Sequence, residues 1–332
     1  MRDVARCQSC NNMKLKKLHK LDQTGTRRFA YDQADARLDR LVLQVNHCLR
    51  SGNPEAIHDL RVAVRRFSQT LRVFKPCFRG KEVRKVRREL KHITDLAGEV
   101  RNCDVTLKLL LKSQKSGTAA LRPKLEGRRQ ECKRGLVGFL RRWSDRKSSV
   151  RWRAALQDAV TVNRGSLGRA PIVKTAQRML PRVAQEFFER GNQAAKTKKS
   201  PAELHRFRIA SKKFRYTLEL FTSLYGPGMN SSLEKIRQAQ GLLGEINDCE
   251  TVRSLLAHYK NADSLMSWLR KRQRRKIEEF HEFWEETFGG DREMRSWNAF
   301  LRRPIERVRP ARKPVARVGP SQGANRRSAA VA

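Results

Sequence analysis

Two segments of the chain repeat one pattern of basic side chains. In each segment a histidine is followed by cations three, seven and eight residues later, as His58, Arg61, Arg65 and Arg66 and as His205, Arg208, Lys212 and Lys213. Arginine offers a planar fork of donors to phosphate oxygens, and lysine is a mobile point charge. Successive turns of a helix are roughly 5.4 Å apart, so a row of such cations can meet successive charges of a linear polyanion. The pattern therefore indicates a polyanion-binding site.

Placed on a helix, each segment separates into an apolar stripe and a basic stripe. The first copy puts Leu60, Val64, Phe67, Leu71 and Phe74 on one stripe, which we expect to face a core. The opposite stripes and their edges supply the candidate binding residues His58, Arg61, Arg65, Arg66 and Arg72 in the first copy, and His205, Arg208, Lys212, Lys213 and Tyr216 in the second. Further candidates outside these two stripes are Arg88, Lys91, Arg101 and Arg237, the last being the echo of Lys91.

A basic face opposite an apolar face is usually only a solvated helix surface, and two features weigh against that interpretation here. The face carries few acids, unlike the mixed-sign surfaces that support solubility. It also recurs in two copies with the histidines in register. Lone histidines are more often structural than functional, but this pair, each three residues before an arginine, favours a binding role.

The repeat extends beyond the basic pattern and organises the chain. The 17 residues that begin at His58 share seven identities with the 17 that begin at His205. A second echo follows both copies, because Leu96–Asp104 is similar to Leu242–Glu250. We therefore expect a duplicated helical unit, with its two halves at residues 30–165 and 168–290.

Apolar residues recur at spacings of three and four through the body, and no convincing alternating strand is present, so the predicted fold class is all-α. Turn residues predict breaks at positions 51–54, 75–76, 116–118, 165–171, 200–201, 226–228 and 289–290. We also expect a bend at Gly98, with Asn102, Asp104 or Asp248 either capping a new helix or holding Arg101 in place. Ser200 is expected to cap another helix.

The charge of the chain calls for a polyanionic partner. Its 332 residues include 74 Lys and Arg against 33 acids, for a formal net charge of +41. A basic tail at 1–28 and a basic Pro/Arg-rich tail at 291–332 are expected to flank a folded body at 29–290, and the second tail is expected to be disordered. Residues 1–28 hold eight Lys/Arg and two acids, and residues 295–332 hold ten and one, so most of the excess lies on the body.

The sequence predicts a cytoplasmic protein without a metal or cofactor. No apolar run approaches the length of a membrane span, so we expect no membrane insertion, and no signal peptide is evident. Seven scattered cysteines suggest reduced thiols. Cys7 and Cys10 form a single CxxC without the further ligands that zinc needs. His58 and His205 stand among too many cations to hold a divalent ion well.

These segments resemble the CHAD family of helical domains with characteristic histidines. Its His-x-x-Arg-[Val/Ile]-x-x-[Arg/Lys]-[Arg/Lys] pattern stands at His58–Arg66 and His205–Lys213. Its Leu-Gly-x-x-Arg-Asp-x-Asp stretch is similar to Leu96–Asp104, with Asn102 in place of the usual Asp and an extra Ala before the Gly, and its Leu-Gly-x-x-Asn-Asp stretch to Leu243–Asp248. Over about 30–288 the resemblance implies two helical bundles related by pseudo-two-fold symmetry around a basic central cleft or pore. It also implies binding of inorganic polyphosphate, often at polyphosphate granules.

Three functions stay open on the sequence. The first is a stand-alone polyphosphate-binding module, since the Glu-x-Glu-x-Lys motif of members fused to a triphosphate-processing domain is not found. The second is non-specific nucleic-acid binding, above all by the tails, although no zinc-finger or RNA-recognition pattern is present. The third is an enzyme acting on a phosphorylated substrate, for which no P-loop, His-Glu-x-x-His or two-metal carboxylate cluster is found. We expect a binding protein and not an enzyme.

Overall fold

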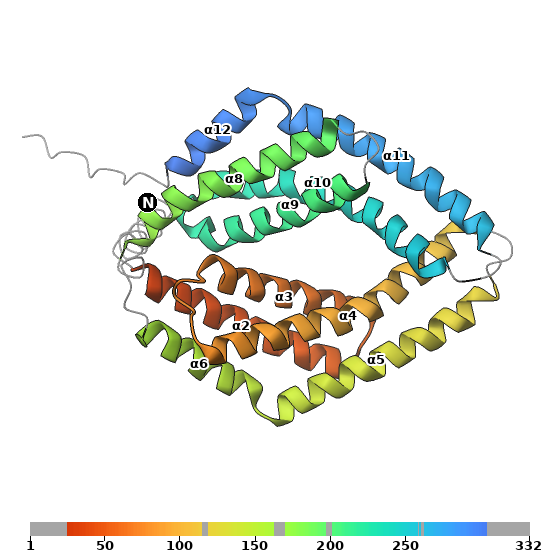
Figure 1. The fold of residues 1–332 in the computed structure, drawn as a ribbon, viewed down its shortest axis with the longest axis horizontal. Coiled ribbons are helices and arrows are strands. Elements are labelled where there is room, and N and C mark those ends of the chain that lie inside the picture. The colour runs from red at the N-terminus through yellow and green to blue at the C-terminus, as the bar shows by residue number, and fades with distance from the viewer. Residues whose placement is uncertain are drawn as a thin grey trace, which may run out of the picture.

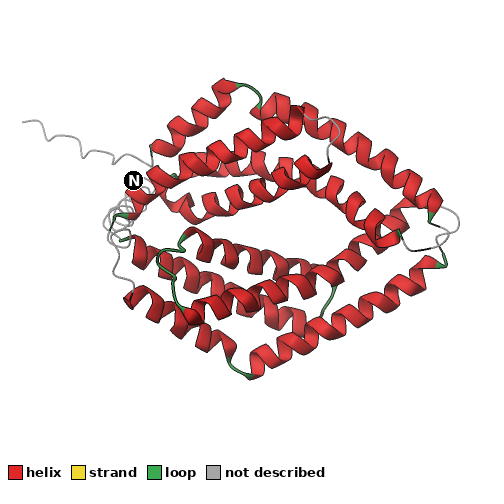
Figure 2. Ribbon diagram, in the orientation of Figure 1, coloured by secondary structure: helices red, strands yellow, loops and turns green. Residues whose placement is uncertain are grey.

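A computed structural model describes residues 25–303 except for 115–118, 163–169, 197–200, 258 and 260–261. Within these residues the chain is helical and has no β-strand (Figure 2), so the predicted all-α class is confirmed. In chain order the α-helices are α2 (Thr26–Arg50), α3 (Pro54–Val73), α4 (Lys81–Ser113), α5 (Leu121–Asp145), α6 (Ser148–Val162), α8 (Ile172–Lys196), α9 (Pro201–Phe221), α10 (Pro227–Leu256), α11 (Asp263–Phe288) and α12 (Asp291–Arg302). None of them is long and apolar enough to cross a membrane.

The helices before and after the 163–169 segment form two sides of the molecule. Figure 1 shows α2–α6 along one side and α8–α12 along the other, with α3 and α9 facing each other between them. Helix lengths follow the same order on the two sides: 25, 20, 33, 25 and 15 residues, then 25, 21, 30, 26 and 12. This order agrees with the repeated motifs, while the duplication and its pseudo-two-fold symmetry stay predictions.

The apolar stripe predicted on the first basic helix is confirmed. Its members, Leu60, Val64, Phe67, Leu71 and Phe74, are all buried in one large core that includes residues of both sides. That core spans the two sides through aromatic contacts: the Phe221 ring of α9 lies 5.9 Å from Phe29 and 6.0 Å from Phe74. Burial of rings of this size is a large apolar contribution to stability.

A second apolar cluster joins the two sides where α4 and α10 meet. Leu109 of α4, Leu125 of α5, Leu256 of α10 and Leu269 of α11 belong to it. Figure 1 shows this junction at the far end of α3 and α9 from the start of α2. The two sides are thus held together at both ends by apolar contacts.

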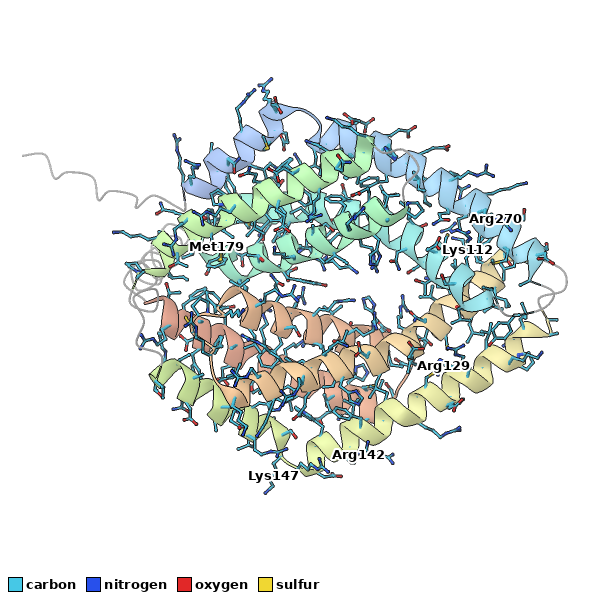
Figure 3. The ribbon with its side chains drawn as sticks, viewed as in Figure 1. Lys112, Arg129, Arg142, Lys147, Met179 and Arg270 are labelled. Atoms are coloured by element: carbon cyan, nitrogen blue, oxygen red, sulfur yellow. The ribbon has the colours of Figure 1, made fainter. Side chains whose placement is uncertain are left out.

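Helix α4 is fixed to α5 by a buried ion pair. The Arg129 Nε donates to the Asp104 Oδ1 at 2.6 Å, and the exposed fractions of the two side chains are 13% and 3%. Figure 3 shows Arg129 on α5 beside α4. Because neither charge is well hydrated, each depends on the other.

The predicted helix break at Gly98 is wrong, and one helix boundary was not predicted. α4 runs unbroken through Gly98, so Asn102 and Asp104 lie inside a helix, and Asp248 lies inside α10. Glycine costs only about 1 kcal/mol in a helix interior, which the packing of such long helices offsets. The turn at Arg146–Lys147 was not expected, because Lys147 adopts a φ of 50° there without a glycine or proline signal. The expected cap at Ser200 lies outside the described residues.

The folded part also continues past the predicted end of the body. Residues 291–302, expected to be disordered tail, form α12, on which Trp297 and Leu301 are buried. The Tyr225 hydroxyl donates to the Leu301 carbonyl at 2.7 Å. The helical spacing of Met294, Trp297 and Leu301 indicates this helix, but the Pro/Arg-rich stretch that follows led to the prediction of a disordered tail. Residues 1–24 and 304–332 lie outside the described part of the chain.

Candidate anion-binding site

A cavity of about 320 Å³ lies between α3, α4, α9 and α10. We call it the basic pocket, because the charged residues that line it are His58, Arg61, Arg65, Arg101, Arg208, Lys212, Arg215, Arg237 and Asp248. Asp248 is the only carboxylate in this lining. A wider cavity of about 440 Å³ between α2 and α6 contains none of the candidate residues and has Val160 and Thr161 beside Arg27 and Arg28. Of these two cavities, only the basic pocket contains candidate binding residues.

Burial and mutual repulsion act on the cations of the basic pocket. Burial first, then Arg208, Arg65 and Arg61, lowers the pKa of Lys212 from 10.5 to about 6, and only Asp248 opposes this. Arg61 has its pKa lowered to about 10, by burial and then by Arg65. The pKa of Arg208 is also lowered, chiefly by burial. An anion placed among these groups would reverse the repulsion.

Arginine donors in the basic pocket also lack partners. The Nε groups of Arg65 and Arg208 are buried and have no hydrogen-bond acceptor among the described residues. The Arg215 Nε also makes no hydrogen bond, but it lies 3.6 Å from the Glu219 carboxylate. Buried donors are rarely left unpaired, because each costs roughly 1–3 kcal/mol. Unpaired guanidinium donors beside a surplus of positive charge are the arrangement that a phosphate group would complete.

The position of Arg61 explains why a glycine, Gly98, occurs in the repeated motif at Leu96–Asp104. A Cβ added at Gly98 would lie 3.1 Å from the Arg61 Nη1, which donates to the Thr94 carbonyl at 3.5 Å. Gly98 thus leaves room for the Arg61 guanidinium to lie against α4 without ending that helix.

Burial raises the pKa of Asp248, while Arg101 and Arg208 act in the opposite direction. Asp248 is therefore placed to hold these two arginines.

His58 stands at the mouth of the basic pocket. The histidine is exposed, and partial burial followed by Arg101 and Arg65 lowers its pKa. A neutral imidazole can still donate one hydrogen bond to a phosphoryl oxygen.

The structure brings together only part of the predicted set. The predicted residues that line the basic pocket are His58, Arg61, Arg65, Arg101, Arg208, Lys212, Tyr216 and Arg237. The residues outside its lining are Arg66, Arg72, Arg88, Lys91, His205 and Lys213.

Each residue outside the lining has its own surroundings. Arg66 binds Glu219 at 2.8 Å, and Lys213 binds Glu186 at 2.5 Å. Lys91 pairs with Asp95 at 2.6 Å on the surface. The Nδ1 of His205 lies 3.3 Å from the Asn247 Oδ1. Arg72 and Arg88 are exposed. The two cations eight residues after the histidines therefore have acidic partners and do not face the basic pocket.

Arg215 was missed by the sequence interpretation. It lies one heptad after Arg208 and therefore on the same face of α9, and its guanidinium stacks 4.8 Å from the centre of the Tyr216 ring. The helical spacing from Arg208 could have identified Arg215. The first copy has Ser68 at the matching position, so comparison of the two copies did not mark this arginine. Polar residues of α10, such as Gln240 and Asn247, complete the lining and were also missed.

No group of three or more His, Cys, Asp or Glu side chains that could hold a metal occurs in the described ranges. Cys7 and Cys10 lie outside those ranges.

Replacing Lys212 by methionine is expected to stabilise the ligand-free protein most at low pH. The folded pKa of Lys212 is about 6 against an ordinary value of 10.5, so the unfolded chain binds the extra proton between these values and wild-type stability rises with pH there. The penalty is complete below pH 6, where we expect Lys212→Met to gain roughly 2 kcal/mol. Urea unfolding at pH 6, 8 and 10 measures this difference.

The matched control is Lys91→Met, since Lys91 is an exposed lysine. This substitution should change the free energy of unfolding by less than about 0.5 kcal/mol. An equal gain for both variants at every pH would show that Lys212 bears no special penalty.

Comparison with known proteins gives a family match and similar solved structures, among them the following two. The family model described as CHAD domain matches residues 32–257, more than half of the chain. The crystal structure of the CHAD domain from the plant Ricinus communis aligns with a TM-score of 0.59 at 18% identity, over 84% of this chain and 92% of the other. PptA from Streptomyces chartreusis aligns with a TM-score of 0.55 at 16% identity, over 80% of this chain and 100% of the other. No curated protein matches the chain. At these identities the structural neighbours show a shared fold.

Proposed function

Because this chain belongs to the CHAD domain family, we propose that it binds inorganic polyphosphate in the basic pocket. CHAD domains are associated in general with polyphosphate binding. The observation that carries the proposal for this chain is the pair of buried guanidinium donors without a hydrogen-bond acceptor on Arg65 and Arg208, which lie in the same pocket on facing helices. Every phosphate unit of a linear polyphosphate carries negative charge and several oxygens that accept hydrogen bonds. Arginines held on facing helices can donate to such oxygens from both sides.

The charge balance of the basic pocket supports a polyanion over a neutral ligand. Seven Lys and Arg side chains line it against one carboxylate. Burial and then its cationic neighbours lower the pKa of Lys212, so negative charge placed nearby would offset the repulsion and favour the ammonium form. Binding of polyphosphate is therefore expected to be coupled to proton uptake.

We further propose that the chain is a binding protein and not an enzyme, acting in the cytoplasm and at polyphosphate granules. The lining of the basic pocket supports the binding role, since cations dominate it and its one carboxylate is beside Arg101 and Arg208. Phosphate release from polyphosphate by pure protein, lost in a His58→Ala variant, would contradict the binding-only proposal.

Titration of the full chain with long-chain polyphosphate and with DNA of equal charge tests the function. At physiological salt we expect polyphosphate to bind at least about tenfold more tightly than single- or double-stranded DNA, because shaped donors add to the counterion release that any polyanion provides. Calorimetry in two buffers of different ionisation enthalpy also measures the proton uptake. Equal affinity for DNA would mean that the charge is generic and that the chain is a nucleic-acid-binding protein.

A further inference from the structure

Two neighbouring lysines on α9 have opposite surroundings. The Lys213 Nζ is held by the Glu186 carboxylate at 2.5 Å. Lys212 points into the basic pocket, is only partly exposed, and has no ion pair or hydrogen bond among the described residues. One helix thus carries a charge-paired amine and an unpaired amine at consecutive positions.

The groups that face Lys212 from the packed helices are nearly all cationic. They are Arg61 and Arg65 from α3, Arg208 from α9, and Asp248 from α10, with Arg101 from α4 and Arg237 from α10 in the same lining. A lysine that is desolvated beside other cations loses its proton and becomes a nucleophile. The same cations attract any small molecule that carries a phosphate group.

We propose that the Lys212 amine is a covalent modification site for small phosphorylated electrophiles, specifically acyl phosphates. In this reaction the neutral Nζ attacks the carbonyl carbon, and the bond from that carbon to the bridging phosphate oxygen breaks. An amide forms, inorganic phosphate leaves, and the proton lost by the amine is taken up by the phosphate or by solvent. Arg65 and Arg208 are placed to hold the phosphate and to stabilise its charge as it departs.

Acylation would remove a basic group from the pocket permanently. The amide cannot take up a proton, so the pocket loses the charge that a bound polyanion would otherwise restore to Lys212. The consequence, weaker polyphosphate binding, rests on the proposed function, whereas the reaction itself depends only on the pocket and the amine.

The test is quantitative mass spectrometry of the full chain treated with acetyl phosphate at pH 7.5. Cleavage after glutamate gives the peptide Leu204–Glu219, which contains both lysines and locates the acetyl group by fragmentation. We expect Lys212 to react at least about tenfold faster than Lys213, because its neutral form predominates. Saturating inorganic phosphate should slow Lys212 and leave Lys213 unchanged.

A neutral acetylating reagent, the N-hydroxysuccinimide ester of acetic acid, separates the two parts of the proposal. Preference for Lys212 with both reagents, and stronger protection by phosphate against acetyl phosphate than against the neutral ester, would support it, because bound phosphate blocks the donor's phosphate site in addition to favouring the ammonium form of Lys212. Preference with the neutral ester alone would refute recruitment of phosphorylated donors, and equal rates at both lysines would refute the activated amine.

An Arg65→Gln/Arg208→Gln variant tests the positioning role of the arginines. Acetyl phosphate should modify its Lys212 at least about fivefold more slowly, since the arginines both recruit the phosphate and disfavour the ammonium form. An unchanged rate would overturn this role. Fast acylation of a wild-type chain that fails to bind polyphosphate would leave this inference standing and refute only the proposed function.

Discussion

Replacing Arg61, Arg65, Arg208 and Lys212 together by glutamine is expected to weaken polyphosphate binding by about 10³-fold. These residues face one another across α3 and α9 in the basic pocket. A hydrogen bond to a charged group is worth roughly 1.5–3 kcal/mol, and four such groups acting on one ligand give less than the full sum. Isothermal calorimetry at physiological salt measures the affinity, and circular dichroism shows whether the helices remain.

The matched control removes the same residue types, three arginines and one lysine, from the surface. Arg72, Arg84, Arg88 and Lys91 are exposed and lie outside the lining of the basic pocket. Their replacement by glutamine should lower affinity only a few-fold, through the loss of general electrostatic attraction. Equal losses for the two quadruple variants would show that net charge governs binding. A larger loss for the surface variant would move the site to the exposed face of α3 and α4, where the sequence analysis had also placed candidates.

The pocket variant is also expected to be at least as stable as the wild-type chain. Its four substitutions remove partly buried cations, and burial followed by mutual repulsion lowers the pKa values of Lys212 and Arg61 among them. A loss of binding that accompanied unfolding would therefore contradict the physical account of the basic pocket itself.

Asp104→Ala is expected to lower the free energy of unfolding by about 3–5 kcal/mol. The substitution leaves the Arg129 guanidinium, 13% exposed, without its carboxylate at the contact between α4 and α5. An uncompensated buried charge carries a cost of this size. Urea unfolding followed by circular dichroism measures it, and an Asp104→Ala/Arg129→Met double variant should recover most of the stability.

Glu250→Ala is the control that the repeat provides. Glu250 matches Asp104 in the second echo, yet its side chain is 45% exposed and its partner Arg253 is 29% exposed. Exposed ion pairs are worth up to about 1 kcal/mol, so this variant should lose no more than that. Equal losses at the two positions would show that burial does not decide the strength of these pairs.

The sequence was most informative where helical periodicity alone decides the outcome. Because 3.6 residues complete a turn, the spacing from Leu60 to Phe74 determined which face is buried, and the opposite face led to the basic pocket. The sequence was least informative where an ion-pair partner far away in the chain determines the direction in which a side chain points. Arg66 and Lys213 have the same local pattern as the pocket residues, but they bind Glu219 and Glu186, which are 153 and 27 residues away. Such pairings depend on how helices pack, which local spacing does not encode.

Long helices also override local signals. Gly98 has the conformational freedom of a break, but the packing of α4 on α3, α5 and α10 keeps that helix continuous. Tertiary packing also explains why α12 forms. Its apolar stripe has only three residues, but these pack against the core beside α8, and Tyr225 donates a hydrogen bond to the helix.

The apolar clusters at the two ends of the molecule have a thermodynamic consequence. Hinging the two sides apart would expose either the contact of Phe221 with Phe29 and Phe74 or the apolar cluster that contains Leu109 and Leu256. The cations of the basic pocket are therefore held near their binding positions before any ligand arrives. Filling such a preformed, polar site buries little apolar surface and orders little of the chain. Association should therefore proceed with a heat-capacity change close to zero, driven mainly by the entropy of the salt ions released.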